Sequence, residues 1–215
     1  MKVILTANDL ARQQQIQRYT PAMFRLTPIV RNLIFLNVIV FILQSIMPIT
    51  EWLALYNVKD AAFKPYQLFT YMFCHADFFH IFFNMLLLSF FGPILEEFWD
   101  QMQFLLFYII AGIGAGVFNI LMDLFFGLGS FSQMIGASGA VYGVMTAFGI
   151  IFPNMELRLL FLPVSFKAKY MVMVLGSIAI YSGFRSDPGD NTAHLAHLGG
   201  IVVAIIMIQF WMRRR

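Results

Sequence analysis

Charged residues are scarce in this 215-residue chain, and a second cysteine is absent. Only 12% of the residues are charged, whereas 60% are hydrophobic, and the mean hydropathy is +0.77. Such a composition excludes an ordinary soluble globular protein. The single cysteine, Cys74, excludes an internal disulfide bond. With 25 phenylalanines and 14 methionines supplying much of the apolar bulk, the composition indicates an integral membrane protein.

Long apolar segments make up most of the chain. Six are present, at approximately 29–48, 73–95, 101–123, 134–152, 169–184 and 192–212, with proline and glycine between them. About 20 apolar residues in helical form cross a bilayer. We therefore predict an all-α membrane protein with six transmembrane helices in residues 28–212. A short basic N-terminal tail (1–27) and a basic C-terminal end (213–215) complete it.

Lysine and arginine predict the orientation. If both termini are cytoplasmic, the inner side carries eleven basic residues and the outer side three, a strong positive-inside bias. The inner set is Lys2, Arg12, Arg18, Arg25, Arg31, Arg158, Lys167, Lys169, Arg213, Arg214 and Arg215; the outer set is Lys59, Lys64 and Arg185. We expect a multi-pass protein with both termini in the cytoplasm.

This orientation brings polar residues from three spans to one depth. Spans two, four and six all run inward, and each has polar residues within its first two turns. These residues are His80 and Asn84, Ser138, and His194 and His197. Polar groups buried in lipid are costly and usually functional. Their common depth in the outer leaflet predicts one shared site.

Ser138 has the surroundings of a nucleophile. A serine hydroxyl needs a base to accept its proton, and histidine is the usual base. Gly136 and Gly139 beside it leave room for close approach. At a helix N-terminus, the Ser138 amide N–H is also suited to stabilise an oxyanion. His80 and Asn84, spaced i and i+4, present two further donors from one helix face.

His197 is the better candidate for the base. It is followed by Gly199 and Gly200, and span four carries Gly139 and Gly143, so these two helices can approach closely. No acidic residue lies near this depth on either span, which favours a serine–histidine dyad over a triad. His194 is the rival base and lies one turn nearer the outside.

Other interpretations of the same residues are open. The Gly-x-Ser-Gly tetrad could serve helix packing alone, and intramembrane histidines could serve proton-coupled transport, although no internal repeat supports a transporter. The four histidines could bind a metal, but no carboxylate or thiolate completes the set. We expect no metal, no cofactor and no nucleic acid. Asp77 and Asp123, near helix ends, are expected to be solvated.

Taken together, these motifs resemble the rhomboid family of intramembrane serine proteases. The resemblance extends over about residues 65–205 and implies the six-helix core common in bacterial members. It assigns the nucleophile to Ser138, the base to His197, and oxyanion stabilisation to His80, Asn84 and the Ser138 backbone. The supporting positions that it implies are Gly136, Gly139, Gly200, His75, Glu96 and Tyr142, with Tyr142 packing against the catalytic histidine. One pair of positions departs from the family pattern: the family often carries Trp-Arg before helix two, and this chain has Tyr66-Gln67.

The resemblance also implies an activity. The chain would be a serine endopeptidase that cleaves in or next to transmembrane segments of membrane proteins, through an acyl-enzyme. The loop 185–191 is short, polar and rich in turn residues, so we expect it to be a mobile cap. Because the termini are short and show no organelle-targeting segment, we expect a bacterial inner membrane, with the site open to the periplasmic side. The rivals are an inactive relative that binds transmembrane helices and a histidine-using transporter.

Overall fold

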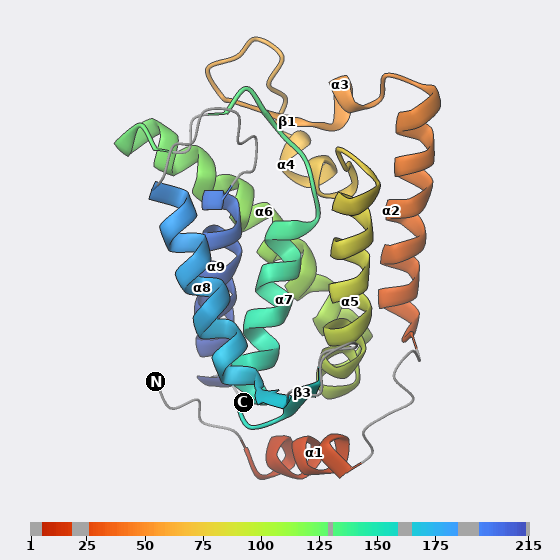
Figure 1. Cartoon of the computed structure of the whole chain (residues 1–215), viewed down its shortest axis with the longest axis vertical. Coiled ribbons are helices and arrows are strands. Elements are labelled where there is room, and N and C mark those ends of the chain that lie inside the picture. The colour runs from red at the N-terminus through yellow and green to blue at the C-terminus, as the bar shows by residue number, and fades with distance from the viewer. Residues whose placement is uncertain (1–5, 19–25, 129–130, 159–164, 185–193, 214–215) are drawn as a thin grey trace.

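The computed structural model describes residues 6–18, 26–128, 131–158, 165–184 and 194–213, and six apolar helices dominate it (Figure 1). They are α2 (Pro28–Ile46), α5 (Phe78–Trp99), α6 (Gln101–Phe126), α7 (Ser138–Ile151), α8 (Ala168–Phe184) and α9 (His194–Arg213). Within the described residues, α2, α5, α6 and α9 are long and apolar enough to cross a membrane, and α7 and α8 are shorter apolar helices. The predicted all-α membrane bundle is confirmed.

Polar side chains set the helix boundaries. The Asp77 carboxylate accepts a hydrogen bond from the His80 N–H at the start of α5 (2.9 Å), and Asp100 does the same for Gln103 in α6 (2.8 Å). Such caps satisfy amides that have no partner inside the helix. At the other end of α6, Gly127 adopts the left-handed conformation that commonly ends a helix (φ 63°).

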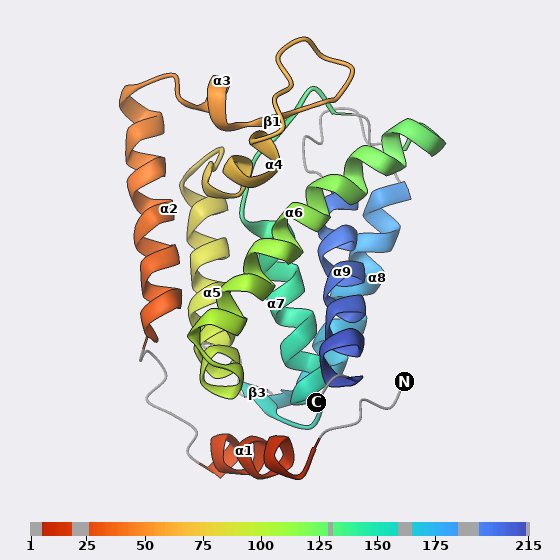
Figure 2. The ribbon, with the colours of Figure 1, turned by 180° about the vertical axis from the view of Figure 1, so that it is seen from behind.

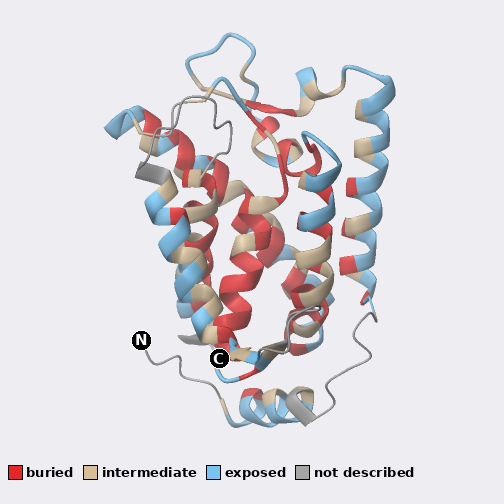
Figure 3. Ribbon diagram, viewed as in Figure 1, coloured by how far each residue is buried: buried red, intermediate tan, exposed pale blue. Residues whose placement is uncertain are grey.

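Helix α7 forms the centre of the bundle (Figures 1 and 2). Eleven of its fourteen residues are buried, and Figure 3 shows buried residues along its length. By contrast, α2, α5 and α8 carry large exposed apolar side chains such as Phe35, Phe79 and Met173. An apolar exterior around a helical bundle is what a lipid environment requires. The first residue of α7, Ser138, is half-buried among the helices at one end of the bundle.

Glycines allow α7 and α9 to approach closely, as the sequence predicts. A Cβ atom added to Gly200 would lie 2.0 Å from the Gly139 carbonyl oxygen, and one added to Gly143 would lie 3.3 Å from the Gly200 oxygen. Any side chain at position 200 would therefore push the two backbones apart. This contact fixes the distance between the first turns of the two helices.

The connection before α5 is structured. It contains the helix α3 (Thr50–Leu53), the strand β1 (Leu55–Tyr56), the helix α4 (Gln67–Thr70) and the 3₁₀ turn η1 (Tyr71–Phe73). Strand β1 pairs antiparallel with β2 (Gln133–Met134), with Leu55 opposite Met134 and Tyr56 opposite Gln133. The predicted start of span two, at approximately residue 73, is too early: α5 begins only at Phe78, after its cap Asp77. His75 therefore lies in the connection and not in the helix.

At the opposite end, a buried carboxylate joins α5 to α2. Glu96 accepts hydrogen bonds from the Thr27 hydroxyl (2.5 Å) and from the amides of Ile29 and Val30 (both 3.0 Å). A negative charge at a helix N-terminus is favoured by its free N–H groups and its dipole. Glu96 thus anchors the start of α2.

The same end carries two smaller elements. Helix α1 (Ala7–Arg18) lies across the end of the bundle within the predicted tail, and Arg12 donates a hydrogen bond to the Trp99 carbonyl (3.4 Å). The strands β3 (Glu156–Arg158) and β4 (Ser165–Lys167) pair antiparallel between α7 and α8. The loop 185–191, predicted as a cap, lies outside the described residues.

Candidate active site

The structure brings Ser138 and His197 together. Ser138 is the first residue of α7, and His197 lies in the first turn of α9. The Ser138 Oγ is 2.8 Å from the His197 Nε2, which is hydrogen-bonding distance for a hydroxyl and an imidazole. This geometry allows the imidazole to accept the hydroxyl proton.

Two aromatic rings, those of Tyr142 and His194, pack against the His197 ring. Tyr142, one turn after Ser138, stacks on it with ring centroids 4.4 Å apart and planes only 3° from parallel. His194 meets it edge-on at 5.9 Å. The stacked tyrosine restricts the rotation of the imidazole and so favours the orientation that faces Ser138. His194 lies on the same helix, with its ring turned across that of His197.

His80 and Asn84 lie on the first turns of α5. The His80 Nδ1 accepts a hydrogen bond from the Ala76 amide (3.4 Å), which favours the tautomer with its proton on Nε2. Asn84 is buried, and its Nδ2 donates to the His80 carbonyl (2.8 Å). The side-chain amide of Asn84 has two N–H groups, so this bond uses one of them.

Gly136 separates His80 from Ser138. Its φ is +125°, a conformation that other residues rarely adopt. A Cβ placed there would lie 2.8 Å from the His80 Nε2 and 3.8 Å from the Ser138 Oγ. These two atoms therefore border the same small space, which only glycine leaves open. Because Gly136 carries no side chain, its backbone can lie close to both atoms.

The other supporting residues take different positions. His75 packs edge-on against His80 with ring centroids 5.0 Å apart. Burial, and secondarily the neighbouring His80, lowers the pKa of His75 to about 3, so that its ring is neutral at physiological pH. Gly139 and Gly200 form the helix contact described above. Glu96 lies at the far end of α5, away from the Ser138–His197 pair.

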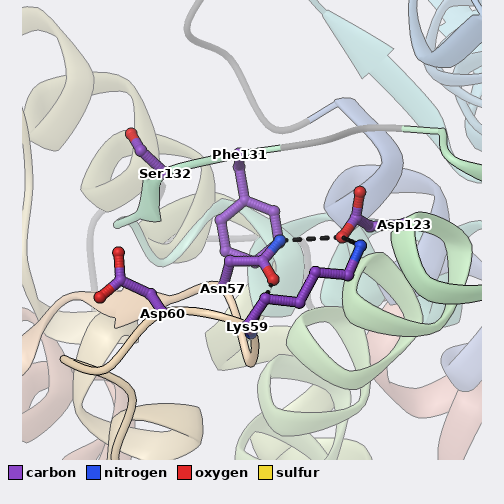
Figure 4. Close-up of a pocket in the computed structure, with 6 residues that line it drawn as sticks. All are labelled: Asn57, Lys59, Asp60, Asp123, Phe131 and Ser132. Carbon is purple, nitrogen blue, oxygen red and sulfur yellow. Dashed lines mark hydrogen bonds and ion pairs between the residues drawn. The ribbon is translucent and has the colours of Figure 1, made fainter.

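The sequence did not predict the polar cluster that Asp123 forms with Asn57 and Lys59. Asp123 was expected to be solvated, but it is 5% exposed, and its Oδ2 accepts from the Asn57 Nδ2 (2.9 Å) and contacts the Lys59 ammonium (3.0 Å; Figure 4). The cluster borders a cavity of about 280 Å³, which Asn57, Lys59, Asp60, Asp123, Phe131 and Ser132 line. The folding of the connection over the end of α6 buries Asp123, and no local sequence signal marks this contact.

Within the described ranges, no group of three or more histidine, cysteine, aspartate or glutamate side chains has the arrangement of a metal site. The arrangement that the site does present is a hydroxyl, an imidazole and several N–H donors. These are the parts of covalent acyl transfer.

Comparison with known proteins decides the family. The Rhomboid domain family matches residues 62–214, which is well over half of the chain. The chain belongs to the rhomboid family. Rhomboids as a family act as intramembrane proteases on membrane protein substrates, and this membership together with the apolar helices makes the chain a multi-pass membrane protein.

Individual rhomboid relatives are distant. The chain is 28% identical to "Rhomboid protein 1, mitochondrial" of Saccharomyces cerevisiae over 82% of this chain and 52% of that protein. It is 27% identical to "Rhomboid-like protein 11, chloroplastic" of Arabidopsis thaliana over 66% of this chain and 51% of that protein. The rhomboid-family protein YdcA of Bacillus subtilis is 27% identical over 88% of this chain and 94% of its own length. The chain thus spans about half the length of the two organellar relatives.

Proposed function

We propose that this rhomboid is a serine endopeptidase that cleaves membrane proteins in or next to their transmembrane segments. The observation that carries the proposal is the 2.8 Å contact between the Ser138 Oγ and the His197 Nε2, held by the stacked Tyr142. Family membership makes a membrane protein the expected substrate class. An inactive helix-binding relative has no need of this pair.

In the proposed first half-reaction, His197 accepts the Ser138 proton while Oγ attacks the peptide carbonyl carbon. The carbonyl oxygen becomes an oxyanion, stabilised by the Ser138 amide at the start of α7 and by His80 and Asn84. The protonated His197 then gives its proton to the leaving amine as the C–N bond breaks. The acyl group remains on Ser138 as an ester.

Water completes the reaction. His197 accepts a proton from a water molecule, whose oxygen attacks the ester carbonyl and forms a second oxyanion. When this intermediate collapses, Ser138 leaves and recovers its proton from His197, and the carboxylic acid product is released. The space beside Gly136, between the His80 Nε2 and the Ser138 Oγ, is where we place both oxyanions.

We also propose the orientation. The connection before α5, which contains Lys59 and Lys64, lies at the Ser138 end of the bundle (Figure 1). The other end has α1, the start of α2 and the β4–α8 junction, which contain Arg12, Arg31 and the Lys167–Lys169 segment. The positive-inside bias then puts both termini in the cytoplasm and the site on the outer side, which is periplasmic in a bacterial inner membrane. Water has its shortest path to Ser138 from that side.

The proposed activity is tested by reconstituting the purified protein in liposomes with a single-span test substrate. The wild type is expected to cut the substrate and Ser138→Ala to leave it intact while still binding it, with fragments identified by mass spectrometry. A folded wild-type protein that binds the substrate uncut would favour the inactive helix binder. One that neither binds nor cuts would also contradict the protease.

A further inference from the structure

Gln67 is a buried polar residue that the proposed mechanism does not use. It opens α4 and is 1% exposed, in the connection before α5 where the family often carries Trp-Arg. A buried amide needs hydrogen-bond partners for both its oxygen and its nitrogen. The partners of Gln67 therefore show what this side chain does in the connection.

All four partners are backbone groups of the same connection. The Gln67 Oε1 accepts from the amides of Lys64 (2.9 Å) and Tyr56 (3.5 Å). Its Nε2 donates to the carbonyls of Ala62 (3.1 Å) and Trp52 (3.4 Å). The segment 52–64 thus forms a loop around the Gln67 side chain, which also holds β1 against α4.

The closed loop holds the strand that leads to Ser138. Tyr56 in β1 pairs with Gln133 in β2, three residues before the Gly136 position. The Tyr71 carbonyl, one turn after Gln67, accepts from the Gly136 amide (2.9 Å). Both attachments act on the segment 133–136, which places the backbone beside the His80 ring and the nucleophile.

A second anchor ties the same loop to α6. Asn57, directly after β1, donates its side-chain N–H to Asp123 (Figure 4). Its backbone amide donates to the Ser132 carbonyl (3.4 Å). Lys59 adds its ammonium to the same carboxylate oxygen. The contact of Asn57 and Lys59 with Asp123 holds the loop against α6, whereas Gln67 holds the loop backbone from within.

We propose that Gln67 is a positioning residue: it holds β1 so that β2 and Gly136 keep the space beside Ser138 in the shape that receives the oxyanion. The proposal rests on the proposed serine protease function. Gln67 does not touch the reacting atoms and acts through the β1–β2 pair and the Tyr71–Gly136 hydrogen bond. Its loss should slow the attack of Ser138 without weakening the binding of a substrate helix.

The experiment measures the rate at which a fluorophosphonate probe modifies Ser138, per folded molecule, together with kcat and KM for the single-span substrate. We compare the wild type with Gln67→Met, which keeps the volume and removes all four hydrogen bonds, and with Gln67→Glu, which keeps the two accepted bonds. We expect the labelling rate and kcat of Gln67→Met to fall about tenfold, with KM changed less than twofold. Gln67→Glu should fall between Gln67→Met and the wild type.

Asn37→Leu is the matched control. Asn37 is also fully buried, but it lies in α2 and donates to the Leu33 carbonyl of its own helix (2.8 Å). Its replacement can change the melting temperature but should leave the labelling rate per folded molecule unchanged. This control separates a general loss of stability from an effect on the site.

The outcomes distinguish the positioning role from the function itself. If the folded wild type neither labels nor cleaves, the protease function fails and the positioning role with it. If the wild type is active and Gln67→Met labels at the wild-type rate, only the positioning role is overturned. The positioning role is also overturned if both Gln67 variants fail to fold, because Gln67 would then support the whole protein. It is overturned as well if Asn37→Leu slows labelling as much as Gln67→Met does.

Discussion

At the scale of single residues, chemical type and spacing were enough to find the candidate site. Ser138 and His197 are 59 positions apart in the chain, yet their Oγ and Nε2 lie 2.8 Å apart. The common depth of polar residues on inward-running helices predicted this approach. The hydrogen bond from Asn84 to its own helix could not be predicted, because it depends on a rotamer that the sequence does not encode locally.

The two histidines of α9 should contribute unequally. His197→Ala removes the group that faces Ser138, so cleavage should fall about 10³-fold or more. His194→Ala removes a ring that only meets His197 edge-on, so most cleavage should remain. The measurement is the initial rate of substrate cleavage, with circular dichroism to show that both variants are folded. Equal losses would mean that the base is assigned wrongly or that the pair acts as a unit.

At the scale of elements, the helices were predictable and their exact starts were not. Apolar length gave the spans, since about 20 residues are needed to cross lipid. The start of α5 depends on the cap from Asp77, which leaves His75 outside the helix. The close contact of α7 with α9 was predictable because glycine is the residue that allows helix backbones to touch.

This contact gives a prediction for Gly200→Ala. The added Cβ would lie 2.0 Å from the Gly139 carbonyl oxygen, so α9 must move away from α7 and carry His197 away from Ser138. A shift of about 1 Å can cost about 100-fold in rate, and we expect a loss of that order in kcat. The melting temperature should also fall.

Gly176→Ala in α8 is the matched control for this change. A Cβ at position 176 meets no atom within 4 Å. Cleavage by this variant should therefore stay close to that of the wild type. If Gly200→Ala retained full kcat, the contact would not set the distance between Ser138 and His197.

At the scale of the whole molecule, composition and charge predicted the class and the bundle, whereas the connection before α5 was not predictable in detail. Its fold depends on contacts between segments far apart in sequence, such as Asn57 with Asp123 and β1 with β2. Such pairs leave no periodic pattern. The buried positions of Asp123 and Gln67 follow from these contacts, and they link the outer surface of the bundle to the nucleophile.

The central claim is that His197 activates Ser138 as a nucleophile, and the most direct measurement is the site of covalent modification by a fluorophosphonate. Purified wild-type protein is incubated with the probe in detergent, digested and examined by mass spectrometry. The account predicts an adduct on Ser138 in the wild type and a large loss of that adduct in folded His197→Ala. An unmodified Ser138 in the folded wild type, an adduct on another residue, or equal modification in His197→Ala would contradict it.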